Sequence, residues 1–144
     1  MIAESLFSKA ANVIRAPHKK VAPWPTVKQG NVRIDEAIIS RNGYRPQRFQ
    51  SDSQPLPKRT SLTFKAKTDV PAPYEVYWQV VNTGPEAEAV AGGLRGGFDA
   101  GSVDKGTAIR KESTLYVGTH TIECFIVKNG YLVARSGAFI VNIV

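Results

Sequence analysis

A single arginine among four glycines is the feature of this sequence most suggestive of chemistry. Arg95 lies between Gly92-Gly93 and Gly96-Gly97. Glycines leave backbone amides open to a ligand, and a guanidinium can hold a phosphate or carboxylate through two parallel hydrogen bonds. Glu86 or Glu88 could equally hold the arginine in a surface ion pair. An anion-binding site and a structural ion pair are both open interpretations.

Other polar residues are candidates for the same ligand. Asn82 ends an expected strand, although Asn-Thr-Gly is also an ordinary turn sequence. Glu112, Thr114 and Tyr116 alternate, so all three should face one side. Arg135 would add a second cation, unless it is a solvated charge of a hairpin. The predicted ligand-binding residues are therefore Arg95, Asn82, Glu112, Tyr116 and Arg135.

The sequence contains no GxSxG, P-loop, HExxH or paired CxxC motif. Its one cysteine and two histidines are too far apart to suggest a zinc site. Cys124 and His120 are four residues apart and could pair as nucleophile and base, but they would face the expected core, where a cysteine acts as a small apolar group. No carboxylates have the spacing of metal ligands for phosphoryl transfer. We therefore expect no enzymatic activity, metal or cofactor.

The net charge of +7 is concentrated in the first half of the chain. Residues 1–70 contain thirteen Lys and Arg against five Asp and Glu, whereas residues 71–144 contain six against seven. A basic surface attracts nucleic acid or another phosphate-bearing partner, but it can equally be a solvated face without a partner. The residues predicted for such a patch are Lys19, Lys20 and Arg48.

The chain of 144 residues is long enough for one domain, and its composition is that of a soluble globular protein. No apolar run approaches the roughly 18 residues of a membrane helix. The N-terminus lacks the order of a secretion signal, and the lone Cys124 excludes an internal disulfide. Both features favour a reducing cytoplasm.

Residues 3–15 are expected to form a short amphipathic helix, because apolar residues recur at spacings of three and four. Such a helix is marginal alone, so it should dock on this domain or on another protein. Prolines between residues 17 and 25 enforce an extended connector around Trp24. We divide the chain into a helix and basic linker, residues 1–21, and a β-domain, residues 22–144.

After the connector the apolar residues alternate as they do in strands. A first strand is expected around Val32, Ile34 and Ile38, with a polar interruption. Asn129-Gly130 predicts a hairpin turn. The expected inward residues are Leu62, Phe64, Ala66, Tyr74, Val76, Trp78, Val80, Ile122, Cys124, Ile126, Phe139, Val141 and Ile143. The expected outward residues of the Trp78 strand are Glu75, Tyr77, Gln79 and Val81.

About seven short strands in about 120 residues predict an all-β fold, an immunoglobulin-like antiparallel β-sandwich. Trp78 lies mid-strand, where such sandwiches bury a core tryptophan. Tyr116 and Gly118 precede His120 at a strand entrance, a corner where a polar aromatic commonly bonds back to the backbone.

Four motifs carry a family resemblance: YxVYWxVxNTGxEA from Tyr74, LRGxF from Leu94, ExTxYxGxH from Glu112 and FxV from Phe139. In this order, over roughly residues 22–144, they resemble the adenylyl/guanylyl and SMODS C-terminal sensor domain. The resemblance implies a domain usually fused behind a nucleotidyltransferase that makes oligonucleotide messengers in bacterial anti-phage systems. The helix at 3–15 is similar to the trailing helix that joins the two.

The catalytic GS motif and paired aspartates of such synthetases are absent from this sequence, so this chain alone should not polymerise nucleotides. The resemblance implies a non-catalytic module that senses a nucleotide, an oligonucleotide or a phage-derived signal. One alternative is a docking domain whose helix and basic face regulate a separate nucleotidyltransferase or effector. Another is a basic domain that binds nucleic acid.

Overall fold

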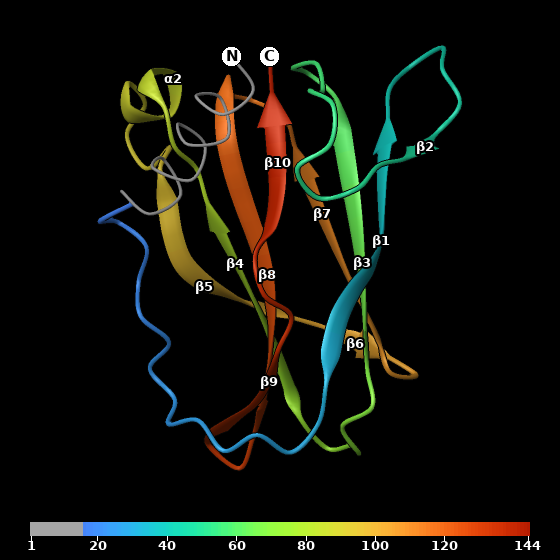
Figure 1. Ribbon diagram of the computed structural model, residues 1–144, viewed down its shortest axis with the longest axis vertical. Helices are drawn as coiled ribbons and strands as arrows, with labels where there is room; N and C mark the ends of the chain where they lie inside the picture. Colours follow the sequence, from blue (N-terminus) through green and yellow to red (C-terminus); the bar gives the residue numbers. More distant parts are fainter. Residues whose placement is uncertain (1–15) are drawn as a thin grey trace.

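The computed structural model describes residues 16–144, in which two antiparallel sheets pack face to face (Figure 1). The first, in the order β2-β1-β3-β7-β6, consists of β1 (Val32–Ser40), β2 (Gln47–Arg48), β3 (Ser61–Thr68), β6 (Val103–Asp104) and β7 (Thr107–Ser113). The second, in the order β10-β8-β4-β5 with β9 also paired to β8, consists of β4 (Glu75–Val81), β5 (Arg95–Gly101), β8 (Gly118–Lys128), β9 (Tyr131–Arg135) and β10 (Phe139–Ile143). The one short helix of this part of the chain is α2 (Pro85–Glu88). The all-β, immunoglobulin-like sandwich is confirmed, and the helix expected at 3–15 lies outside the described residues.

The core between the sheets follows the predicted alternation. Trp78 is fully buried mid-strand in β4, opposite Cys124 of β8, which is buried beside it. Leu62, Phe64 and Ala66 cover this core from β3. The inward faces of β3, β4, β8 and β10 are therefore those that the sequence predicts, because apolar residues recur at every second position.

The first strand departs from strict alternation. The pairing of β1 with β3 shifts between Ile34 and Glu36, which marks a β-bulge. The extra residue reverses the facing of the rest of the strand, so that Ala37 and Ile39 pack on the core. The strand expected around Val32, Ile34 and Ile38 is confirmed, and the bulge lies in its polar interruption.

The predicted hairpin at Asn129-Gly130 joins β8 to β9. Both residues have positive φ, 53° and 81°, as a two-residue turn of this kind requires. The prediction of this turn is confirmed.

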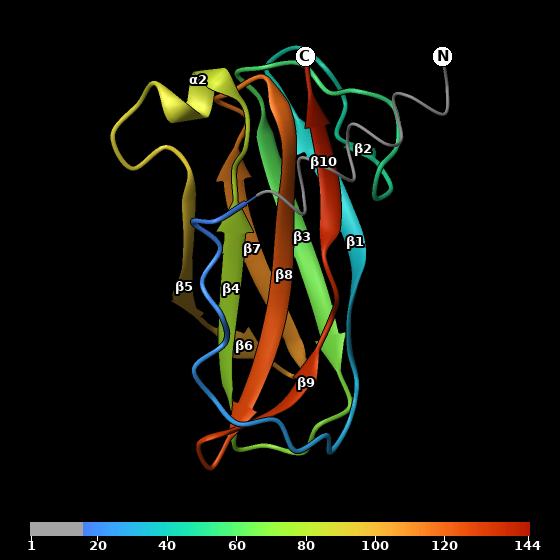
Figure 2. The same ribbon diagram turned by 60° about the vertical axis from the view of Figure 1, so that its left-hand side comes forward.

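Residues 16–29, which we call the strap, run across the outer face of the second sheet (Figure 2). The Lys20 amide donates to Gly96 of β5, and the Val27 amide donates to Leu132 of β9. Between these anchors, Trp24 lies 4.6 Å from Tyr77 and 5.1 Å from Phe98, measured between ring centroids. The strap therefore gives this face an apolar cluster of its own.

This cluster buries part of the outer face of β4, where the strap covers it. Gln79 is only 2% exposed and Val81 3%. Gln79 is covered because its side chain bonds to the strap, and Phe125 of β8 is fully buried in the cluster. Residues 16–21, predicted to be a linker, run along β5 in the structure, while the division of the chain at residue 22 stays a prediction.

Gly101→Ala should lower the free energy of unfolding by about 1–3 kcal/mol, the usual cost of overpacking a core. A Cβ at this position would lie 2.9 Å from Cδ1 and Nε1 of the Trp78 indole. Gly97→Ala is the matched control in the same strand, because a Cβ there meets nothing within 4 Å. Urea denaturation would measure both variants. Equal stability of the two would show that the indole can move away.

Candidate functional site

A cavity of about 640 Å³ lies at the end of the sandwich where β4 and β7 end and β8 begins. Side chains from both sheets form its apolar lining, which consists of Leu62, Phe64, Val80, Ile122, Val141 and Ile143. Hydroxyl and charged groups, including Thr114, complete its wall. Its size is within the usual range for small-molecule pockets.

The cavity brings together four of the five predicted ligand-binding residues. Asn82, Arg95, Glu112 and Tyr116 all line it, although they come from separate segments of the chain. They meet because the ends of β4 and β7 and the start of β5 lie at the same end of the sandwich. Arg135 lies elsewhere, on β9, and does not line this cavity.

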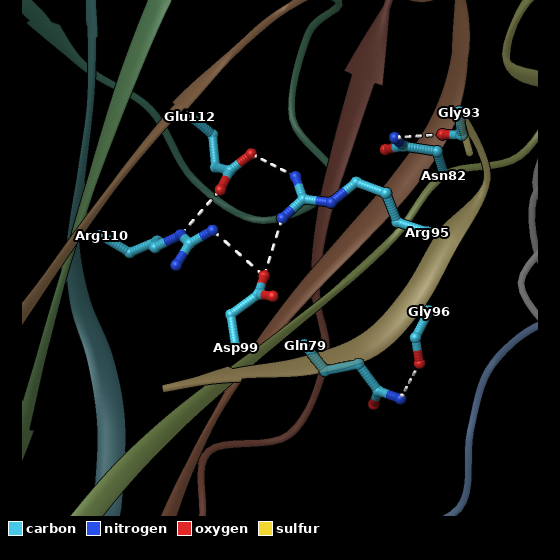
Figure 3. A network of polar contacts seen from close by, with 8 residues as sticks. All are labelled: Gln79, Asn82, Gly93, Arg95, Gly96, Asp99, Arg110 and Glu112. Carbon is cyan, nitrogen blue, oxygen red and sulfur yellow. Dashed lines mark hydrogen bonds and ion pairs between the residues drawn. The ribbon is translucent and has the colours of Figure 1, made fainter. Parts of the chain in front are cut away.

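Arg95 is held by carboxylates from two strands (Figure 3). Its Nη1 donates to Glu112 Oε1 at 2.5 Å, and its Nη2 donates to Asp99 Oδ2 at 2.9 Å. Arg110 contacts the same two acids, at 2.7 Å to Glu112 Oε2 and 3.1 Å to Asp99 Oδ2. These four residues, which we call the ionic quartet, join β5 of one sheet to β7 of the other.

The quartet contains two cations and two anions, so its formal charge is zero. Partial burial works to lower the pKa of Arg95, but hydrogen bonds and charges from Glu112 and Asp99 outweigh it and raise that pKa. The predicted alternative partner Glu86 bonds to Lys58 Nζ at 2.6 Å instead. An arginine with oriented donors therefore lies in the cavity wall.

The glycines around Arg95 serve the packing of the chain itself. A Cβ on Gly93 would overlap the carbonyl oxygen of Ala87 in α2, and a Cβ on Gly96 would overlap the carbonyl oxygen of His18 in the strap. Gly96 also has a φ of 111°, which other residues rarely adopt. These two glycines are thus explained by close backbone approach rather than by access for a ligand.

Asn82 connects the cavity wall to its surroundings. Its Nδ2 donates to Gly93 O at 2.8 Å, and its amide donates to Leu94 O at 2.9 Å. Its carbonyl oxygen lies 2.7 Å from His18 Nε2 of the strap. Asn82 therefore does more than close a turn, because it holds the segment before Arg95 and the strap together.

The model of the adenylyl/guanylyl and SMODS C-terminal sensor domain family matches residues 14–144. The chain belongs to this family. A search of curated proteins finds no match. The match covers nearly the whole chain and includes the strap, the quartet and every residue that lines the cavity. A sensor domain of this family is non-catalytic in itself.

The possible nucleophile and base of the sensor domain both have structural roles. Burial raises the pKa of the Cys124 thiol to about 12, so the reactive thiolate is scarce. Burial also lowers the pKa of His120. The His120 ring accepts from the Thr83 amide through Nδ1, which leaves Nε2 to donate to Tyr116 O at 2.7 Å. The corner bond predicted near Tyr116 is thus made by His120.

The three residues of the predicted anion patch do not form one surface. Lys19 and Lys20 lie on the strap beside β5, whereas Arg48 lies on β2, the far edge strand of the other sheet (Figures 1 and 2). Arg48 Nη2 lies 3.4 Å from Glu36 Oε1. Among residues 16–144 no group of three or more His, Cys, Asp and Glu is placed to hold a metal ion. The same residues include no helix long and apolar enough to cross a membrane.

Sequence reasoning missed three residues of the sensor domain's site. Asp99 and Arg110 complete the quartet, and Gln79 donates from Nε2 to Lys20 O at 2.8 Å and to Gly96 O at 2.9 Å. A signal was present for Arg110, because a charge at an inward position of a strand predicts a partner across the sandwich. No comparable signal marks Gln79, whose burial depends on the strap.

Proposed function

We propose that this sensor domain binds a nucleotide or oligonucleotide in the cavity, as a ligand-sensing module of bacterial anti-phage oligonucleotide signalling. The observation that carries the proposal is Arg95, oriented by two carboxylates in the wall of a cavity with an apolar lining. A base or sugar can pack on apolar side chains, while a phosphate needs a cation with fixed donors. The cavity offers both within one site.

Arg95 keeps donors for such a ligand. A guanidinium has five N–H groups, and two of them serve Glu112 and Asp99. Both oxygens of Glu112 are occupied by arginines, so its role is to position Arg95. Asn82 and Tyr116 flank the arginine in the cavity wall and supply uncharged polar groups for the rest of the ligand.

The test is calorimetric titration of the purified protein with ATP, GTP, cyclic dinucleotides, cyclic trinucleotides and short single-stranded DNA and RNA. We expect Arg95→Ala to weaken the binding of a phosphate-bearing ligand at least tenfold, about 1.4 kcal/mol. Arg95→Lys should recover part of the affinity, because it keeps the charge without the planar fork. Arg48→Ala is the control for a general loss of positive charge.

Other outcomes would favour the other functions. Nucleotide binding that is unaffected by Arg95→Ala would place the site elsewhere. Failure to bind any of these ligands would favour docking to a nucleotidyltransferase or effector. Affinity that falls steeply with salt and depends on Lys19, Lys20 and Arg48 would favour a nucleic-acid-binding domain.

A further inference from the structure

Two segments that form the cavity wall also contact the strap, on the side away from the cavity. Asn82 and Arg95 line the cavity, while the backbone of the same segments holds the strap through Asn82 O and Gly96 O. Gly96 O accepts from the Lys20 amide at 3.0 Å and from Gln79 Nε2 at 2.9 Å. In Figure 3 the Gln79–Gly96 bond lies on the side of β5 away from the ionic quartet.

Arg95 and Gly96, which we call the joint, are an irregular segment of β5 between the cavity and the strap. Both have positive φ, 56° and 111°, and the pairing of β4 with β5 shifts at this point, between Gln79 and Val81. The guanidinium projects into the cavity wall while the next carbonyl holds the strap. A rotation of the backbone at Arg95 would therefore move the Gly96 carbonyl away from its two donors.

Arg95 can leave the ionic quartet without leaving either carboxylate unpaired. Arg110 bonds to the same two acids, at Glu112 Oε2 and Asp99 Oδ2. If a phosphate draws Arg95 away, both carboxylates keep a cationic partner. Breaking a partly buried ion pair is costly mainly when it leaves a charge unpaired, and Arg110 prevents this.

We propose that ligand binding in the cavity is transmitted to the strap. A phosphate-bearing ligand that draws Arg95 from Glu112 and Asp99 turns the Arg95-Gly96 joint and releases His18 to Lys20 from β5. Occupancy of the cavity is thereby passed to the strap. This inference rests on the proposed function, because it requires an anionic ligand at Arg95. By linkage, release of the strap should favour the ligand as much as the ligand favours release.

The first arm of the test needs no ligand. Arg95→Met removes the guanidinium that fixes the joint, whereas Arg110→Met removes a guanidinium from the same carboxylates without touching the joint. We expect the Lys20 amide to exchange with deuterium roughly three to tenfold faster in Arg95→Met than in Arg110→Met, as loss of about one hydrogen bond would give. Exchange at Phe125 in the middle of β8 should stay slow in both and shows that the variants are folded.

The second arm adds ATP or inorganic pyrophosphate to the wild-type protein. Binding should speed exchange at Lys20 and shift the fluorescence of Trp24, the tryptophan of the strap. Trp78 is fully buried in the core and should contribute no change. Trp24→Phe is the control that assigns the fluorescence signal.

The outcomes separate this inference from the proposed function. Equal exchange at Lys20 in the two methionine variants would overturn the coupling, whatever binds. Binding that depends on Arg95 but leaves Lys20 protected would overturn the coupling and keep the proposed function. Faster exchange in Arg95→Met without binding of either probe would support the coupling and count against a phosphate ligand. Faster exchange at Lys20 in Arg95→Met, together with faster exchange and a Trp24 fluorescence change when a probe binds, would support the full inference.

Discussion

Phe125→Ala should lower the free energy of unfolding by about 3–5 kcal/mol, the range for removing a buried aromatic side chain. Phe125 is fully buried on the outer face of β8, 5.1 Å from Phe98 and 6.5 Å from Trp24 between ring centroids. Its loss would leave a cavity between the second sheet and the strap. Urea denaturation followed by circular dichroism measures the change.

Ile109→Ala is the matched control on the other sheet. Ile109 lies on the outer face of β7 and is 48% exposed. Its truncation should change the free energy of unfolding by no more than about 0.5 kcal/mol. Similar losses of unfolding free energy in the two variants would mean that the strap does not bury the outer face of the second sheet. They would also weaken the inference that ligand binding is transmitted to the strap.

The inner core was predictable from the sequence, but the cluster under the strap was predictable only in part. Alternation identifies one buried face of a strand, and β3 has only one. The continuous apolar run after Glu123 in β8 is typical of a strand buried on both faces, which is a signal for the second cluster. Nothing local indicates that Trp24 covers this run, because its partners are far away in sequence.

The candidate site was also only partly predictable from the sequence. Asn82, Arg95, Glu112 and Tyr116 were predictable because each is a polar residue near a strand end, and strand ends meet in a sandwich. The hydrogen bonds and ion pairs of these residues were less predictable. β5 and β7 belong to different sheets, so their contact depends on tertiary packing rather than on strand pairing. Four of the five predicted residues therefore line one cavity, their binding of a ligand stays a prediction, and the partners of the arginine differ from those considered from the sequence.

Arg135→Met should lower the free energy of unfolding by about 3 kcal/mol, near the lower end of the loss when one partner of a buried ion pair is removed. Arg135 donates from Nε and Nη2 to Glu123 at 2.8 and 2.9 Å. The Glu123 side chain is 5% exposed, whereas that of Arg135 is 48% exposed. The variant leaves a buried carboxylate with the Gly137 amide as its remaining donor. Methionine keeps apolar contact with Phe125, over which the guanidinium lies.

A second substitution separates the lost ion pair from lost packing. Adding Glu123→Gln to Arg135→Met removes the unpaired charge and keeps a carbonyl oxygen for Gly137, so it should recover at least half of the stability. No recovery would assign the loss to packing on Phe125. Because Arg135 lies outside the cavity, the single variant should also keep the nucleotide affinity of the folded protein. Unchanged stability with lost affinity would instead make Arg135 a ligand contact, as the sequence alone suggested.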